Sequence, residues 1–442
     1  MAQIILGNPK LRFIKGMFYA APPPPPPEYL TIEALEDDFQ IEFYNDCNAQ
    51  YSLNEGPWTP FEDSLSPVMN AGDILYVKGE LEQGYSCGNF YTEQSFNLFG
   101  NCNSLIFGDN ASLYRDLTGY NDCYTGLFSG CIGLRNVSPN FLPATTLAEY
   151  CYSNMFENCT SLVSTPELPA TTLAEYCYDH MFSWCASLVT TPGILPATTL
   201  DTGCYAYMFM DCSSLASAPS LPATELAYEC YNGMFSATNV LPDCTNIDFT
   251  SESVVASGGL KGLFAGTKVT DNDLYNILPI NPSTGKYCLP VTTLTNYCYD
   301  GMFARCPSLV TAPALPATTL AQGCYASMFE NCASLVTAPG ILPATTLVKK
   351  CYSNMFSNCT SLTTAPELPA TTLTTDCYYK MFFGCALLNY IKALFTTKPS
   401  YTFTGEWVKG VSSTGIFVKS RSASWNVTGT YGIPTGWTVQ TV

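Results

Sequence analysis

A single motif, C-Y-x-x-M-F, recurs through this chain at nearly constant spacing. Most gaps between its first cysteines are 26–28 residues, one gap is 68, and eight of the nine copies carry a second cysteine eight residues later. Two decayed copies, ending near Leu105 and at Thr267, extend the series to about eleven units. A repeat of this length indicates an array in which each unit buries its apolar face against its neighbours. The first cysteines of the nine clear copies are Cys123, Cys151, Cys177, Cys204, Cys230, Cys298, Cys324, Cys351 and Cys377.

Residues 142–167 illustrate the fold expected of one unit. Thr146 followed by Glu149 matches a capping box, which predicts a helix start, and two sister units repeat the pattern. On a helical wheel the two cysteines, the methionine and the phenylalanine of the unit fall on one half. A short extended run begins at Leu162 and ends at Pro166, because proline cannot donate to a strand ladder. The sequence therefore predicts a short strand, a proline-bounded turn and a helix of about three turns per unit.

The units resemble a known type of repeat. Leu162, Leu168, Leu173 and the F-x-x-C-x-S-L core are similar to leucine-rich repeats of the BspA-like type, over about two thirds of the chain. The resemblance implies an α/β leucine-rich-repeat solenoid with a short strand and a short helix in each 26–27-residue unit. It also implies a surface that recognises a partner, not an enzyme.

The segments outside the repeats have different compositions. Residues 22–27 are six prolines, which favour a stiff polyproline II spacer. Alternating apolar runs after residue 29 predict an all-β sandwich, and a Thr-, Val- and Trp-rich end predicts a C-terminal β cap. The expected domains are an N-terminal attachment arm with the spacer (1–28), a small β-sandwich (29–88), a first solenoid part (89–238), an irregular insertion with one decayed repeat (239–297), a second solenoid part (298–390) and the β cap (391–442).

Charge and composition exclude several classes of function. The 442 residues carry a formal charge of −18, which disfavours a nucleic-acid ligand because binding one requires clustered Lys and Arg. His180 is the only histidine, so a histidine-based catalytic triad or metal centre is disfavoured. We therefore expect no catalytic residue, no cofactor-binding residue and no metal site. Apolar stretches near the N-terminus are interrupted by Asn8 and Lys10, against a secretory signal, and none is long enough for a membrane span.

The 22 cysteines allow three interpretations. Within a unit the two cysteines would lie about 12 Å apart along a helix, too far for a disulfide. The favoured interpretation is that they form columns of small buried apolar side chains. Disulfides between units would require an oxidising compartment. A zinc site is disfavoured, because the sequence has no C-x-x-C pair and His180 occupies an outward position.

Bulky side chains at outward positions form the candidate adhesion surface. Exposed aromatic residues can anchor a partner, although packing against the insertion or a neighbouring subunit explains them equally well. The candidates are Trp184, Tyr207, Met210, Tyr379 and Phe383.

The chain as a whole resembles a second group of proteins. The sandwich, the repeats and the ending IPTGWTV are similar to repeat proteins encoded by phages and prophages of gut anaerobes. This implies a non-enzymatic virion structural protein of the head or tail, of a fibre or decoration type, made in the host cytoplasm. Its partners would be other virion proteins, reached through the arm, and a host surface protein or glycan, and it would form a homo-oligomer. The alternative is a secreted BspA-like adhesin on the bacterial cell surface.

Overall fold

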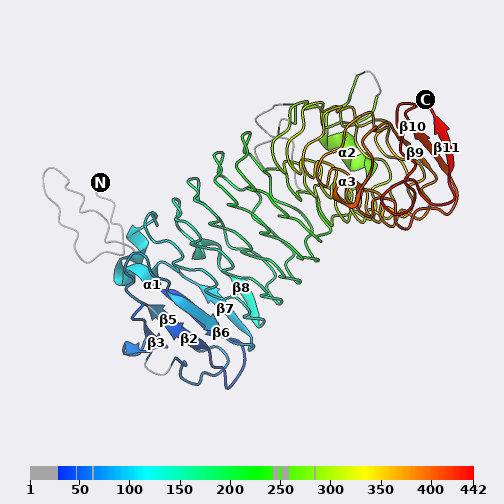
Figure 1. The fold of residues 1–442 in the computed structure, drawn as a ribbon. Helices are drawn as coiled ribbons and strands as arrows, with labels where there is room; N and C mark the ends of the chain where they lie inside the picture. Colours follow the sequence, from blue (N-terminus) through cyan, green and yellow to red (C-terminus); the bar gives the residue numbers. More distant parts are fainter. Residues whose placement is uncertain are drawn as a thin grey trace, which may run out of the picture.

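The structure is a computed structural model, which describes residues 28–45, 47–61, 64–241, 247, 249–250, 258–282 and 285–442. The expected attachment arm and proline spacer therefore lie outside the described residues, apart from Glu28. Figure 1 shows small sheets at the N-terminal end, a long array of stacked loops, and another small sheet at the C-terminal end. Within the described ranges, none of the helices is long and apolar enough to cross a membrane.

The N-terminal part consists of two sheets. The larger has the strand order β4-β3-β5-β1-β7-β8 and the smaller pairs β2 with β6. All pairings are antiparallel except that of β7 with β8, which is parallel and carries the larger sheet into the first repeat unit. The strands are β1 (Leu30–Ala34), β2 (Glu42–Asn45), β3 (Gln50–Leu53), β4 (Thr59–Pro60), β5 (Ile74–Lys78), β6 (Gly88–Tyr91), β7 (Phe96–Phe99) and β8 (Leu134–Val137).

Short helical segments adjoin these sheets. They are α1 (Ser104–Phe107) and the 3-10 segments η1 (Gly108–Leu113) and η2 (Pro139–Phe141). The smaller sheet leads directly into the array, because Phe43 of β2 stacks on Phe90 of β6 and Phe90 stacks on Phe128 of the first clear unit. The N-terminal part thereby covers the apolar end of the array.

The predicted strand and helix in each unit are wrong. Between β8 and β9, the described residues contain one α-helix, α2, the three-residue 3-10 segment η2, and no strand longer than an isolated bridge. Thr146, expected to cap a helix, instead bridges Thr172 of the next unit. The α/β leucine-rich-repeat solenoid is therefore not the fold of this chain: the sheets are small and lie at the two ends, and the units between them are built of turns.

A left-handed residue at every fourth position explains why no helix forms. In the unit of Cys151 the φ angles of Tyr150, Asn154 and Asn158 are 53°, 56° and 56°. A right-handed helix cannot contain such residues, which cost about 1–2 kcal/mol each for an ordinary side chain. Sister units place positive φ at the same three positions, often with glycine or asparagine. We call the stretch from two residues before the first cysteine to the second cysteine the turn segment, residues 149–159 in this unit.

Backbone hydrogen bonds alternate along each turn segment. The amide of Met155 donates to the carbonyl of Tyr152 three residues earlier, at 3.3 Å, and closes a turn. The next amide, of Phe156, donates to the carbonyl of Met181 in the following unit, at 2.9 Å. The same alternation runs along the segment and recurs in the other units. Half of these amides therefore hold a unit to its neighbour, a role that the amides of an α-helix cannot have.

Identical side chains form columns inside the array. Phe156 and Phe182 stack with ring centroids 5.5 Å apart, and Phe182 and Phe209 with 5.6 Å. A parallel column contains Tyr152, Tyr178 and Tyr205. All of these rings are buried, so the columns are the core of the array.

The second cysteine of each unit links it to the unit before. The thiol of Cys185 donates to the carbonyl of Phe156 at 3.1 Å, and seven sister cysteines make the same contact. Where Thr238 replaces the cysteine, its hydroxyl donates to the carbonyl of Phe235 in its own unit. The 21 cysteines in the described part of the chain are buried, and none of them is in a disulfide bond.

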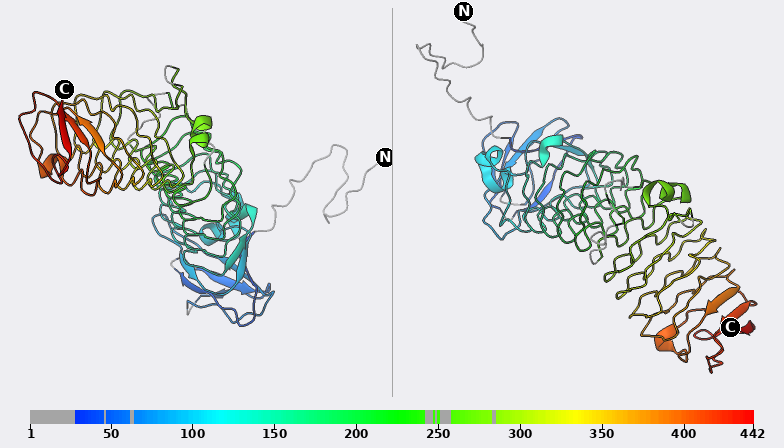
Figure 2. Two further views of the ribbon diagram at one scale, coloured as in Figure 1. Left: turned by 90° about the vertical axis from the view of Figure 1, so that its right-hand side faces the viewer. Right: turned by 90° about the horizontal axis from the view of Figure 1, so that it is seen from above.

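The array continues through the interruption in the repeat. The decayed unit around Gly262 bonds to both neighbours: Gly233 donates to Lys261 and Gly262 donates to Asp300. The following chain forms α2 (Asp271–Ile277), whose Thr270 and Asp273 make a true capping box. Figure 2 shows the array changing direction near α2.

A small parallel sheet closes the C-terminal end. Its order is β11-β10-β9, and Trp407 extends the tyrosine column by stacking on Tyr378 with centroids 6.0 Å apart. The indole of Trp407 donates to the carbonyl of Gly432, which ties the last unit to the end of the chain. The elements are β9 (Tyr390–Ala393), α3 (Tyr401–Thr404), β10 (Ile416–Lys419) and β11 (Thr438–Thr441).

Replacing Tyr178 with phenylalanine should stabilise the protein. Its buried hydroxyl has no hydrogen-bond partner among the described residues, and desolvating such a group is unfavourable. We expect Tyr178→Phe to raise the free energy of unfolding by about 1 kcal/mol in chemical denaturation. Tyr124→Phe is the matched control, because the Tyr124 hydroxyl donates to Cys102 and Asn103, so its loss should destabilise. A loss of stability in Tyr178→Phe would contradict the prediction.

Candidate functional site

The predicted surface residues fall into two separate groups. Trp184, Tyr207 and Met210 lie on neighbouring turn segments, and the backbone amide of Trp184 donates to the carbonyl of Met210. Tyr379 and Phe383 lie together on the last clear unit, beyond the interruption. Trp184 is 50% exposed, whereas the other four are half-buried. The structure thus brings together the first three candidates and, elsewhere, the last two.

Tyr207 is held in place on both sides. Its ring stacks on His180 of the preceding unit with centroids 4.6 Å apart. Its hydroxyl accepts a hydrogen bond from the Asn232 side-chain amide at 3.0 Å. A Cβ added to Gly233 would lie 2.6 Å from the Tyr207 ring, and Gly233 has φ of 58°, so glycine is required beneath the ring. Tyr207 is therefore a rigid part of the surface.

His180 forms an ion pair within its own turn segment. Its Nδ1 lies 3.0 Å from a carboxylate oxygen of Asp179. Burial lowers the pKa of His180, but the hydrogen bond and the charge of Asp179 raise it more, so the net pKa is raised. The pair stabilises the folded state when His180 is protonated, and this contribution is lost as the pH rises through the raised pKa. The ion pair with Asp179 and the stacking on Tyr207 give His180 a structural role on the surface.

A second aromatic stack on the same surface was missed. Tyr150 and Tyr176 stack with centroids 5.2 Å apart, and Tyr150 is 37% exposed. Both directly precede a first motif cysteine, a position outside the apolar half of the helical wheel, yet neither is among the predicted surface residues. The sequence does carry a signal for this stack, because the next unit has a glycine, Gly203, at the same position. A Cβ at Gly203 would lie 2.2 Å from the Tyr176 ring.

The second group of candidates has cationic neighbours. The ammonium of Lys380 lies 5.3 Å from the ring centroid of Tyr379 and 5.4 Å from that of Phe383. Lys409 lies over Phe383 as well and forms an ion pair with Glu406 at 2.7 Å. These rings are therefore already occupied by cation–π contacts within the chain.

Asp300, in the unit of Cys298, is an acidic side chain whose pKa is raised by burial. Burial raises its pKa from 3.8 to about 6, Lys261 opposes the rise, and Glu229 adds to it. The folded protein therefore binds this proton more tightly than the unfolded chain does. The contribution of Asp300 to the free energy of unfolding is therefore largest below about pH 4, and it is lost as the pH rises through about 6.

Asp300→Asn should consequently stabilise the protein at pH 8 and have no such effect at pH 4. We expect a gain of about 1 kcal/mol at pH 8, less than the pKa shift alone implies because attraction to Lys261 is also lost. Chemical denaturation at both pH values measures it. Glu225→Gln, at an exposed position, controls for the general relief of negative charge. An equal gain at both pH values would contradict this assignment.

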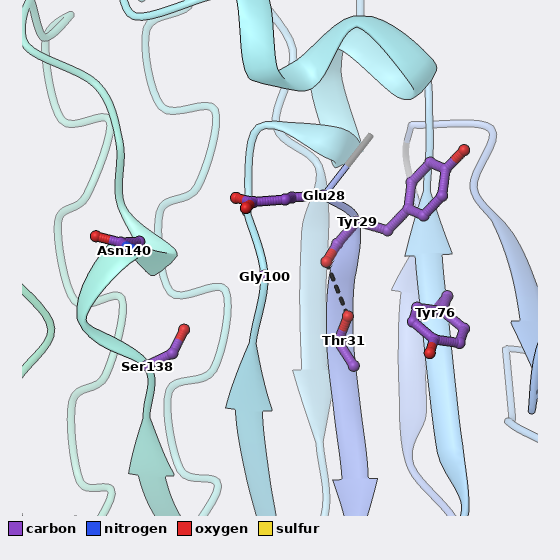
Figure 3. A pocket seen from close by; sticks show the side chains of 7 residues that line it. All are labelled: Glu28, Tyr29, Thr31, Tyr76, Gly100, Ser138 and Asn140. Atoms are coloured by element: carbon purple, nitrogen blue, oxygen red, sulfur yellow. Dashed lines mark hydrogen bonds between the residues drawn. The ribbon is translucent and has the colours of Figure 1, made fainter. Parts of the chain in front are cut away.

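Figure 3 shows a depression of the surface at one end of the larger N-terminal sheet. It has a volume of about 310 Å³ and is lined by Glu28, Tyr29, Thr31, Tyr76, Gly100, Ser138 and Asn140. Glu28 is the only charged side chain among them. The Tyr29 hydroxyl points away to Asp109, which also binds Lys78 at 2.8 Å. The lining residues thus lack the paired carboxylates of a glycosidase.

The described residues also offer no metal site. No group of three histidine, cysteine, aspartate or glutamate side chains among them could hold an ion. Burial raises the pKa of the Cys151 thiol to about 12 and that of the Cys159 thiol well above its usual value, which disfavours the thiolate that a metal requires.

Comparison with known proteins gives no relative for this chain. No family model, no curated protein and no solved structure matches it.

Proposed function

We propose that the protein is a non-enzymatic structural component of a phage virion, of the fibre or decoration type on the head or tail. In this proposal the array presents an adhesive surface for a host protein or glycan, and the N-terminal arm joins the chain to other virion proteins. The resemblance to repeat proteins of phages and prophages supports the virion assignment. The aromatic side chains of Trp184 and Tyr207 on the array support the adhesive role.

One observation carries the adhesive role: the exposed ring of Trp184 and the held ring of Tyr207 lie on neighbouring turn segments. Aromatic side chains bury a large area at low cost in side-chain entropy and dominate many interfaces. Because Tyr207 is already fixed by His180 and Asn232, little freedom remains to be lost on binding. Tyr207 therefore has the properties of a preorganised anchor, and Trp184 adds an exposed aromatic ring on the neighbouring unit.

Binding of the labelled protein to host cells tests the adhesive role. We expect Trp184→Ala and Tyr207→Ala each to weaken binding at least tenfold, in the range of interface anchors. Tyr85→Ala is the matched control, since Tyr85 is 61% exposed but lies in the N-terminal part, and it should leave binding unchanged. Unchanged binding by both array variants would refute the adhesive role.

Particle incorporation tests the virion role separately. Deleting residues 1–28 should remove the protein from purified particles, because the arm is the proposed attachment. Retention of the shortened chain in particles would contradict attachment through the arm. Cell binding by a chain that never enters particles would instead support a bacterial surface adhesin.

A further inference from the structure

Charge is distributed very unevenly along this chain. From residue 136 to residue 260 there is no lysine or arginine, and there are twelve acidic residues. From residue 261 to residue 442 there are twelve lysines and arginines against seven acidic residues. The first half of the array is thus strongly acidic, and the rest of the chain, from residue 261 to the C-terminal end, is mildly basic.

The outward side of the first turn segments combines this acidity with aromatic rings. We call this surface the acidic face and define it by Glu149, Tyr150, Glu157, Glu175, Tyr176 and Trp184. Glu149, Tyr150, Glu175 and Trp184 are exposed, and the other two are half-buried. Stacked rings beside carboxylates suit a partner that is both cationic and apolar, through ion pairs and cation–π contacts.

The chain itself contains a segment of the complementary kind. Residues 1–27 carry Lys10, Arg12 and Lys15 and no acidic residue. In residues 10–15, K-L-R-F-I-K, these cations are interspersed with apolar side chains. The segment lies outside the described residues and is followed by the six prolines.

We propose that residues 10–15 of one copy dock on the acidic face of a second copy. The face lies on two neighbouring units, those of Cys151 and Cys177, whose phenylalanine rings are 5.5 Å apart. The cations and apolar side chains of the segment would meet its carboxylates and aromatic rings. The sequence predicts that the six prolines form a stiff spacer, which favours docking on a second copy over docking on the same chain.

This inference concerns purified chains and does not depend on adhesion or phage origin. Analytical ultracentrifugation of the full chain should show self-association that weakens at least about tenfold between about 50 and 300 mM salt. The arm variant K10E/R12E/K15E and the face variant E149Q/E175Q/W184A should both be monomeric. The control K286E/K349E/K398E reverses three exposed cations in the basic half and should associate normally. Loss of association in that control would overturn the proposal in favour of contact between the two halves of the array.

Mixing the two monomeric variants gives the sharper test. The face variant keeps an intact arm and the arm variant keeps an intact face, so together they should form a heterodimer although neither associates alone. A wild-type chain that is monomeric at every concentration, or a mixture without heterodimer, would overturn the proposal. Circular dichroism of each variant, unchanged from the wild type, confirms that folding is intact.

Discussion

Phe182→Ala is expected to lower the free energy of unfolding by about 3–5 kcal/mol. Phe182 is fully buried in the middle of the phenylalanine column, with a ring stacked on each side at 5.5 and 5.6 Å. Truncation loses the transfer free energy of the ring and leaves a cavity that neighbouring rings cannot fill, because their own turn segments fix them. Chemical denaturation monitored by fluorescence measures the effect.

Phe383→Ala provides the comparison at an outward position. Phe383 is half-buried and contacts Lys380 and Lys409, so its truncation should cost less than about 1 kcal/mol. Equal losses for the two phenylalanines would contradict the assignment of inward and outward positions. Because units in an array contact only their neighbours, a second unfolding transition in Phe182→Ala is also compatible with the account.

Gly301→Ala should destabilise the protein by about 1–2 kcal/mol. Gly301 has φ of 61°, and an added Cβ would approach Ala304 no closer than 3.9 Å, so the effect comes from the left-handed backbone and not from a clash. In a helix the same change would stabilise by about 1 kcal/mol, since alanine is the better helix former. The sign of the change therefore distinguishes a turn segment from a helix.

Two further glycines complete that experiment. Gly126 has φ of 65° in an equally open position, so Gly126→Ala should give the same loss as Gly301→Ala. Gly193 has open space around it and no left-handed backbone, so Gly193→Ala should be neutral or slightly stabilising. Stabilisation at Gly301 and Gly126 would refute the account of the turn segments.

The sequence pattern identified the buried side chains correctly and their backbone wrongly. Cys151, Met155, Phe156 and Cys159 are all buried, as their spacing predicts. That spacing, two inward residues followed by two outward ones, has a period of 4, and over nine residues it is hard to distinguish from the helical 3.6. The telling signal was the frequent glycine and asparagine at every fourth position, including Asn154 and Asn158, where left-handed residues are favoured.

The candidate surface could be predicted only in part. Trp184 is exposed because an outward position in the repeat carries a bulky side chain. The stack of Tyr150 on Tyr176 and the support of Tyr207 by His180 join different units, and their alignment depends on hydrogen bonds between units. If each unit were a helix, the side chains of adjacent units would be aligned differently. Neither aromatic pair could therefore be predicted without knowledge of the backbone.

Far-ultraviolet circular dichroism of the full chain tests the central claim most directly, namely that the repeat units are stacked turn segments. The account predicts a spectrum with little helical signal, because the described α-helices are α1, α2 and α3, of 4, 7 and 4 residues. Nine helices of three turns would instead make roughly a quarter of the chain helical. A spectrum with that helical content would contradict the account.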